Sequence, residues 1–150
     1  MKAKSDKRLK LSVQYMVARE NLPSRRQLRK WTLAALKRRA QITLRIVGEK
    51  EGRALNRNFL GRDYATDVLT FAYPGRPLAG DIALCAPVVR REARDHRMSL
   101  NACYAHLVVH GVLHLQGYDH HHKAEARKME KKEARIITGL GFPDPHEHLD

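Results

Sequence analysis

The stretch that decides the fold is "SLNACYAHLVVHGVLHLQGYDH", residues 99–120. Its apolar residues recur at intervals of three and four, which is the spacing of one face of a helix. Ser99 is a good N-terminal cap, and Gly117 favours the left-handed conformation in which many helices end. The pattern therefore predicts a helix over residues 99–116, after which the chain can turn back on itself.

Outward from this helix, the flanking sequence alternates between strand and helix patterns. Strand patterns occupy residues 11–17, 42–47, 67–73 and 81–86. The last of these runs is apolar on both faces, so we expect that strand in the interior of a sheet. Helix patterns occupy residues 24–39, 48–60, 87–96 and 123–138.

The order of these elements predicts an α+β protein. We expect a single domain with a small mixed four-stranded sheet and helices packed on it. We expect the chain to consist of a basic flexible arm at residues 1–10, the domain at residues 11–142 and a C-terminal tail at residues 143–150.

Charge is the strongest feature of the composition. Lysine and arginine total 29 against 16 acidic residues, which gives a formal net charge of +13 and an isoelectric point near 10.2. Such an excess in a small domain favours a polyanionic partner, nucleic acid in particular, over a protein that is merely basic.

The sequence also indicates the compartment. No run approaches the roughly 18 apolar residues of a membrane span, and the basic N-terminus lacks the apolar stretch of a secretion signal. We expect a cytoplasmic protein that does not bind membranes. Its two cysteines, Cys85 and Cys103, are then expected to be buried and reduced.

Three histidines have the spacing of a metal site. His110 and His114 are four residues apart, so their rings leave one face of the helix a turn apart. The turn at Gly117 brings His120 toward them and completes the H-x-x-x-H-x-x-G-x-x-H pattern of metzincin proteases. The sequence predicts a zincin-like helix that holds one Zn²⁺ ion through His110, His114 and His120. Three protein ligands leave a fourth position open, as in catalytic zinc sites.

Other histidines offer alternatives to this set. His106 also precedes His110 by four residues, but no glycine turn and later histidine follow that pair at the right distance. We interpret His106 as packing or as a partner of a ligand. His121 or His122 could replace His120, although the spacing favours His120.

Gly111 stands where HExxH proteases have the glutamate that acts as general base. The sequence therefore identifies no general base, and peptide hydrolysis becomes a weaker hypothesis than cleavage of a phosphodiester. A glycine in the middle of a helix costs about 1 kcal/mol relative to alanine, so it needs a reason. One such reason is that a substrate or a strand approaches the helix closely at this position.

With these motifs, the chain resembles the YbeY family, bacterial rRNA maturation factors described as metal-dependent endoribonucleases. The resemblance is strongest in "HLVVHGVLHLQGYDH", residues 106–120, and extends to "LNRNFLGRDYATDVLTFAY", residues 55–73, and "GDIALC", residues 80–85. It spans most of residues 11–142. It implies an α+β fold with zinc on the three histidines named above. It also implies cleavage of single-stranded RNA, 3′-end maturation of 16S rRNA in the small ribosomal subunit, and ribosome quality control.

One position departs from the family pattern. The middle motif of the family usually reads Tyr-Arg-Gly-Lys-Asp, and its arginine is thought important for work on RNA. Here Leu60 stands at the position of that arginine. Either a neighbour, Arg62 or Arg57, takes over the contact, or activity is reduced. We favour Arg62, because arginine can hold a phosphate through two hydrogen bonds, although it could merely replace the family's lysine.

The sequence therefore favours a zinc-dependent endoribonuclease, a hydrolase, acting on rRNA. Two rivals stay open. One is a non-catalytic rRNA-binding assembly factor with a structural zinc, and the weaker one is a zinc metallohydrolase of peptides.

Overall fold

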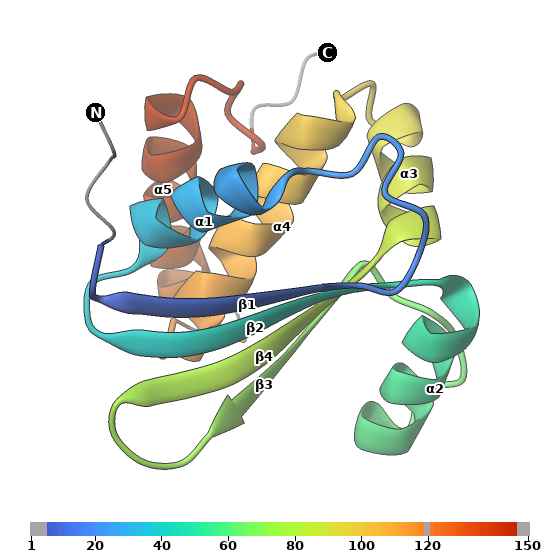
Figure 1. Cartoon of the computed structure of the whole chain (residues 1–150). Coiled ribbons are helices and arrows are strands. Elements are labelled where there is room, and N and C mark those ends of the chain that lie inside the picture. The colour runs from blue at the N-terminus through green and yellow to red at the C-terminus, as the bar shows by residue number, and fades with distance from the viewer. Residues whose placement is uncertain (1–5, 119–120, 147–150) are drawn as a thin grey trace, which may run out of the picture.

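The computed structural model describes residues 6–118 and 121–146. The elements are β1 (Leu9–Tyr15), α1 (Arg25–Ala35), β2 (Ala40–Val47), α2 (Glu49–Leu60), β3 (Val68–Tyr73), β4 (Leu78–Cys85), α3 (Ala86–Asp95), α4 (Leu100–Leu115) and α5 (Lys123–Gly139). Their order confirms the predicted single α+β domain (Figure 1). Within the described residues, no helix combines the length and the apolar character that crossing a membrane requires.

The four strands form one mixed sheet in the order β1-β2-β4-β3. β1, β2 and β4 are parallel, whereas β3 pairs antiparallel with β4. In register, Leu44 of β2 lies between Val13 of β1 and Ile82 of β4. β4 is therefore an interior strand, as its apolar sequence predicts, and Ile82 and Leu84 are fully buried.

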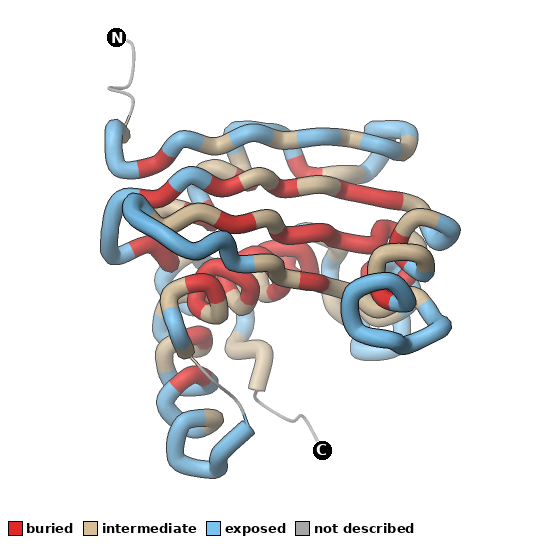
Figure 2. Tube along the Cα trace, turned by 90° about the horizontal axis from the view of Figure 1, so that it is seen from below, coloured by how far each residue is buried: buried red, intermediate tan, exposed pale blue. Residues whose placement is uncertain are grey.

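The two faces of the sheet differ in what covers them. Helices α1, α3, α4 and α5 lie on one side of the sheet, and α2 alone lies on the other (Figure 1). β2 follows this division, because Ile42, Leu44 and Ile46 are buried while Gln41 and Arg45 are not. Seen from below, the buried residues gather along the middle strands and the helix behind them (Figure 2).

The helix that carries the histidines is confirmed close to its predicted limits. The Ser99 side chain accepts a hydrogen bond from the Ala102 backbone at 3.0 Å, and Gly117 has the expected positive φ of 97°. A Cβ atom on Gly111 would lie 3.1 Å from Ile82 and 3.2 Å from Thr70. The mid-helix glycine therefore lets α4 approach β3 and β4 closely, which is the strand alternative of the sequence interpretation.

The end of α1 differs from the prediction, which extended this helix to residue 39. The helix ends at Ala35 because Gln116, at the end of α4, replaces its next turn. The Gln116 amide donates to the Ala35 carbonyl at 2.7 Å and accepts from the Lys37 backbone at 2.8 Å. Leu36 is buried beside this junction. A tertiary contact, rather than the local sequence, sets this boundary.

The start of β1 and the state of the two cysteines bear on two smaller expectations. β1 begins at Leu9, two residues before the predicted strand and inside the expected basic arm. Cys85 and Cys103 are both buried and form no disulfide, as predicted.

Candidate metal centre

Three histidines stand one turn apart along one side of α4. His106, His110 and His114 are each half-buried. The ring centroids are 6.2 Å apart for His106 and His110, and 5.6 Å apart for His110 and His114. Two imidazoles bound to one tetrahedral zinc have centroids about 5 Å apart, given Zn–N bonds of about 2.0–2.1 Å. The separation of His110 and His114 is therefore compatible with a shared ion.

Helix α5 brings a buried carboxylate against this row. Glu133 is 1% exposed. Its Oε1 lies 2.7 Å from Nδ1 of His110, and its Oε2 lies 2.7 Å from Nε2 of His106. A buried carboxylate is stable only when its oxygens accept hydrogen bonds. The geometry therefore assigns the proton to Nδ1 in His110 and to Nε2 in His106, each donating to Glu133.

These contacts keep Glu133 ionised. Burial by itself raises the pKa of the Glu133 carboxyl, but the hydrogen bonds that His106 and His110 donate, with their electrostatic attraction, outweigh it. The net effect holds the pKa well below its ordinary value of 4.5. The Glu133 carboxyl therefore favours its ionised form beneath the histidines.

A third imidazole reaches Glu133 from the segment that follows α5. Nε2 of His146 lies 2.9 Å from Oε2 of Glu133, and the His146 backbone donates to Asp144 at 2.8 Å. The Phe142 ring packs edge-on against Trp31, with centroids 5.9 Å apart, and holds this segment on the helices. Residues 142–146 therefore lie against the candidate site.

One group within residues 6–118 and 121–146 brings its donor atoms close enough to share an ion. It consists of His106, Glu133 and His146, whose donor atoms lie within 4.8 Å of one another. Two imidazoles and a carboxylate form a known zinc donor set. The nitrogen–oxygen distances of 2.7 and 2.9 Å are hydrogen-bond lengths, and ligands of one zinc stand about 3.3 Å apart. An ion at this group would replace the shared protons and separate the donors slightly.

The predicted ligand set lies only partly within the described residues. His110 and His114 are present on α4, but His120 and its neighbour Asp119 lie outside the described residues. Because Nδ1 of His110 faces Glu133, a metal held by His110 must use Nε2. A carboxylate behind a histidine in this way is the usual arrangement that orients a metal ligand.

A cavity of about 910 Å³ adjoins the cluster, and His106 forms part of its wall. The wall also carries the acidic residues Asp67, Glu92 and Asp95. Burial, together with the hydrogen bond and charge of Asp67, raises the pKa of Glu92 to about 7. The cavity beside the cluster is therefore lined by several acidic side chains together with Arg97.

The predicted RNA contacts lie at the end of α2, on the other side of the sheet from α4 (Figure 1). Arg57 occupies the last turn of the helix, and Arg62 follows Gly61, whose φ of 72° ends it. Both arginines are exposed, and Arg57 lies 3.9 Å from the carboxylate of Asp63. Leu60 is 56% exposed, so the residue that replaces the family's arginine also points to the surface.

Comparison with known proteins identifies the family of this chain. The sequence profile described as "Endoribonuclease YbeY" matches residues 12–141. The chain belongs to the YbeY family. This confirms the resemblance, and the family name supports an endoribonuclease.

Individual YbeY relatives match over almost the whole chain. The endoribonuclease YbeY of Nitrosospira multiformis is 52% identical over 155 residues, covering 93% of this chain and 82% of that relative. The endoribonuclease YbeY of Nitrosomonas eutropha is 54% identical over 137 residues, covering 91% and 97%. The solution structure of TM1509 from Thermotoga maritima matches with a TM-score of 0.55 and 25% identity, covering 92% and 99%.

Sequence reasoning missed two residues of the site in this YbeY chain. Glu133 carried a usable signal, because it sits four residues from both Met129 and Ile137 in the buried stripe of α5. A carboxylate in an apolar stripe needs a buried partner. His146 carried no such signal, because only the return of the chain after α5 brings it to Glu133.

Proposed function

We propose that the chain is a single-strand-specific, metal-dependent endoribonuclease that acts in 16S rRNA 3′-end maturation and ribosome quality control. Its partners are then rRNA and the small ribosomal subunit, in the cytoplasm. Family membership supports RNA as the substrate, and the net charge of +13 supports a polyanion. The observation that carries the proposal is the hydrogen bond from His110 to the buried carboxylate of Glu133, because it fixes the ring as catalytic metal ligands require.

We assign His110, His114 and His120 to one Zn²⁺ ion. The 5.6 Å separation of the first two rings and the carboxylate behind His110 support this donor set. When bound, such an ion polarises a phosphoryl oxygen and lowers the pKa of water at its open position. The chain itself contributes orientation, because Glu133 fixes the plane and the tautomer of His110 while His106 holds the second carboxylate oxygen.

Two nucleophiles are compatible with this site. Either a water molecule attacks the phosphorus, or the 2′-hydroxyl of the RNA attacks it and displaces the 5′ oxygen of the next nucleotide. The second route forms a 2′,3′-cyclic phosphate end. Its appearance among the early products indicates the hydroxyl, and its absence throughout the reaction indicates water.

The decisive experiment measures metal content and cleavage together. Purified protein is analysed for bound metal, and an rRNA 3′-end fragment is incubated with it in the presence and absence of chelator. We expect His114→Ala to remove cleavage while folding and binding to the small subunit persist. Glu130→Ala, an exposed residue of α5 that lines neither cavity, is the control and should cleave normally. Nuclease-free protein that cuts equally well with chelator would refute the metal-dependent assignment.

The third ligand can be tested in the same assay. We expect His120→Ala to lose metal and activity together, because its spacing fits the family pattern. His121→Ala is its neighbour and control. Loss of metal in His121→Ala but not in His120→Ala would transfer the assignment to His121.

The second candidate function is a non-catalytic assembly factor that binds rRNA and holds a structural zinc. The group of His106, Glu133 and His146 favours it, because its carboxylate is nearly inaccessible and its donors come from three separate segments. In that case His146→Ala loses the metal and thermal stability, and His114→Ala retains rRNA processing in cells. The opposite pattern supports catalysis.

We further propose that Arg62 takes the place of the arginine that Leu60 replaces. Arg62 is exposed directly after α2, where its guanidinium can reach a phosphate. Arg62→Ala should weaken RNA binding several-fold and lower the salt dependence of binding by about one phosphate contact. Arg57→Ala is the comparison, because Arg57 lies near Asp63. Unchanged affinity and cleavage in Arg62→Ala would remove this assignment.

A further inference from the structure

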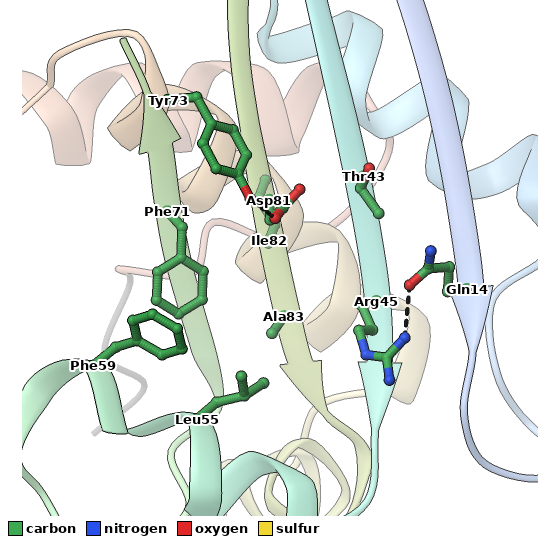
Figure 3. A pocket seen from close by; sticks show the side chains of 10 residues that line it. All are labelled: Gln14, Thr43, Arg45, Leu55, Phe59, Phe71, Tyr73, Asp81, Ile82 and Ala83. Carbon is green, nitrogen blue, oxygen red and sulfur yellow. Dashed lines mark hydrogen bonds between the residues drawn. The ribbon is translucent and has the colours of Figure 1, made fainter. Parts of the chain in front are cut away.

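The sheet face opposite the histidines carries a cavity of about 410 Å³ that the metal site does not use. Side chains from all four strands and from α2 line it. Figure 3 shows Phe71 and Tyr73 on β3, Phe59 reaching over from α2, and Arg45 with Gln14 on the opposite wall. Two residues of its wall, Phe59 and Tyr73, are more than half exposed, so the cavity reaches the surface.

Three aromatic rings form one wall of this cavity. Phe59 is 64% exposed and Tyr73 is 52% exposed. The Phe59 ring leans on Phe71, with centroids 4.9 Å apart and planes at 59°. A cluster of exposed aromatic rings leaves apolar surface in contact with water. Such apolar patches mark binding surfaces. The rings therefore indicate a ligand with apolar faces.

Polar groups beside the rings are held in place by their neighbours. Arg45 donates to Gln14 at 2.7 Å and to Glu51 at 2.5 Å. The Tyr73 hydroxyl donates to Asp81 on the adjacent strand. Donors and acceptors fixed next to aromatic rings can contact the polar edge of a flat ligand while the rings contact its faces.

We infer that this face is a stacking platform for unpaired bases of single-stranded RNA, with Phe59 and Tyr73 contacting the bases. Four-stranded sheets with exposed aromatic residues bind single strands in this way, because every base has a π face. The inference rests on the proposed endoribonuclease function and adds the place where the bases of the substrate bind. Phe59, Phe71 and Tyr73 are called the aromatic platform below.

Charge favours RNA over a protein as the occupant. The exposed arginines Arg57 and Arg62 lie within three residues of Phe59 in the sequence, at the end of α2. Aromatic rings interleaved with cationic side chains are the pattern of single-strand binding, in which rings take bases and cations take phosphates. The net charge of +13 adds long-range attraction for the same ligand.

A single strand, β3, separates the aromatic platform from α4, the helix that carries the histidines. Thr70 and Phe71 are neighbours on β3, so their side chains point to opposite faces of the sheet. Thr70 faces α4, because its methyl group lies 3.2 Å from the position of a Cβ on Gly111. Phe71 faces the cavity. β3 is one of the two edge strands, so an RNA strand that passes around this edge could contact both faces.

The test uses tryptophan fluorescence. The chain has one tryptophan, Trp31, which is only 3% exposed, so Phe59→Trp adds an exposed reporter on the aromatic platform. Metal-free full-length protein is titrated with a short unlabelled oligouridine, so that binding is measured without cleavage. We expect Phe59→Trp to bind the oligouridine, because a tryptophan ring also stacks on bases. Its fluorescence should be quenched with the same Kd that anisotropy of labelled RNA gives.

The complementary variant removes the ring but keeps apolar bulk. Phe59→Leu should weaken binding of the same oligouridine about tenfold, since stacking on one ring contributes about that factor or more per base. Met16→Ala, another exposed large apolar residue outside the cavity, is the control and should bind like the wild type. Far-ultraviolet circular dichroism of all three variants verifies that the fold is retained.

The outcomes separate this inference from the proposed function. Wild-type binding and cleavage with no quenching in Phe59→Trp and no loss in Phe59→Leu would overturn the aromatic platform and leave the endoribonuclease standing. The same result, together with weaker binding of Phe59→Leu than of the wild type to RNase-treated ribosomal subunits, would mean that a protein occupies this face. That outcome would also overturn the aromatic platform. Wild-type protein that neither binds nor cleaves RNA refutes both proposals.

Discussion

The helix-covered face of the sheet and its open face hold polar groups in opposite ways. On the covered side, one buried carboxylate, Glu133, accepts hydrogen bonds from three imidazoles. On the open side, Arg45 and Asp81 remain partly exposed and pair with neighbours beside solvent. A hydrogen bond is electrostatically stronger in the protein interior than in water. A polar group without a hydrogen-bond partner also costs more free energy there. The covered side can therefore fix a catalytic geometry, while the open side can exchange its partners for a ligand.

The largest effect should come from removing the carboxylate at the centre of the covered side. Glu133→Ala leaves three imidazole donors without their acceptor, so we expect a loss of about 3 kcal/mol in the free energy of unfolding. Zinc affinity should fall about 10- to 100-fold, because His110 loses its orientation. Urea unfolding and competition with a chromophoric chelator measure the two quantities.

The open face supplies the control for this variant. Glu51→Ala removes the carboxylate that pairs with Arg45, where both side chains are about one-third exposed. Solvent screens this pair, so the loss should stay below about 1 kcal/mol. Equal losses for the two variants would mean that burial does not distinguish the two faces.

The next effect concerns the close contact between the sheet and α4. A Cβ on Gly80 would lie 2.6 Å from Leu115 and 2.9 Å from the backbone oxygen of Phe71, which the sheet holds in place. Gly80→Ala should therefore cost about 2 kcal/mol. Gly111→Ala meets only side chains, at 3.1 Å or more, and gains helix propensity, so it should cost about 1 kcal/mol or less. Urea unfolding ranks the two, and the reverse order would contradict this packing.

A smaller effect should depend on pH. The folded pKa of Glu92 is about 7, above its ordinary value of 4.5, so the folded state favours the protonated form. The contribution of protonated Glu92 to the stability of the folded state is complete below pH 4.5 and is lost as the pH rises through 7. Glu92→Gln should therefore gain stability relative to the wild type between pH 5.5 and pH 8, by about 1 kcal/mol after allowance for solvent screening. Parallel urea titrations at the two pH values test this, and a constant difference would contradict it.

The smallest effect is expected on the open face itself. Gln14 is exposed and its amide oxygen accepts from Arg45 at 2.7 Å. Gln14→Ala should change the free energy of unfolding by less than about 0.5 kcal/mol, since water replaces the lost acceptor. A loss above about 1 kcal/mol in urea unfolding would show that the open face is as tightly specified as the covered one.

Local patterns predicted the elements but not all of their ends. Alternation placed β2, and helical spacing with Ser99 as cap placed α4, because these signals lie within the segment itself. The end of α1 could not be predicted, because the group that terminates it, Gln116, lies 81 residues from Ala35 in the sequence. The site divides in the same way. The position of His110 and His114 one turn apart on α4 follows from their spacing, whereas the contact of His146 with Glu133 depends on how the chain returns after α5.

By itself, the sequence determined the class of fold, the family, the positive charge and the histidines of α4, since each is a property of residue type or short-range spacing. The tertiary structure alone decided which side chains meet. It placed Glu133 under His106 and His110, brought His146 to the same carboxylate, and left Phe59 and Tyr73 on an open sheet face. The physical reason is that burial and hydrogen-bond partners depend on the packing of segments that are distant along the chain, and no local pattern contains that information.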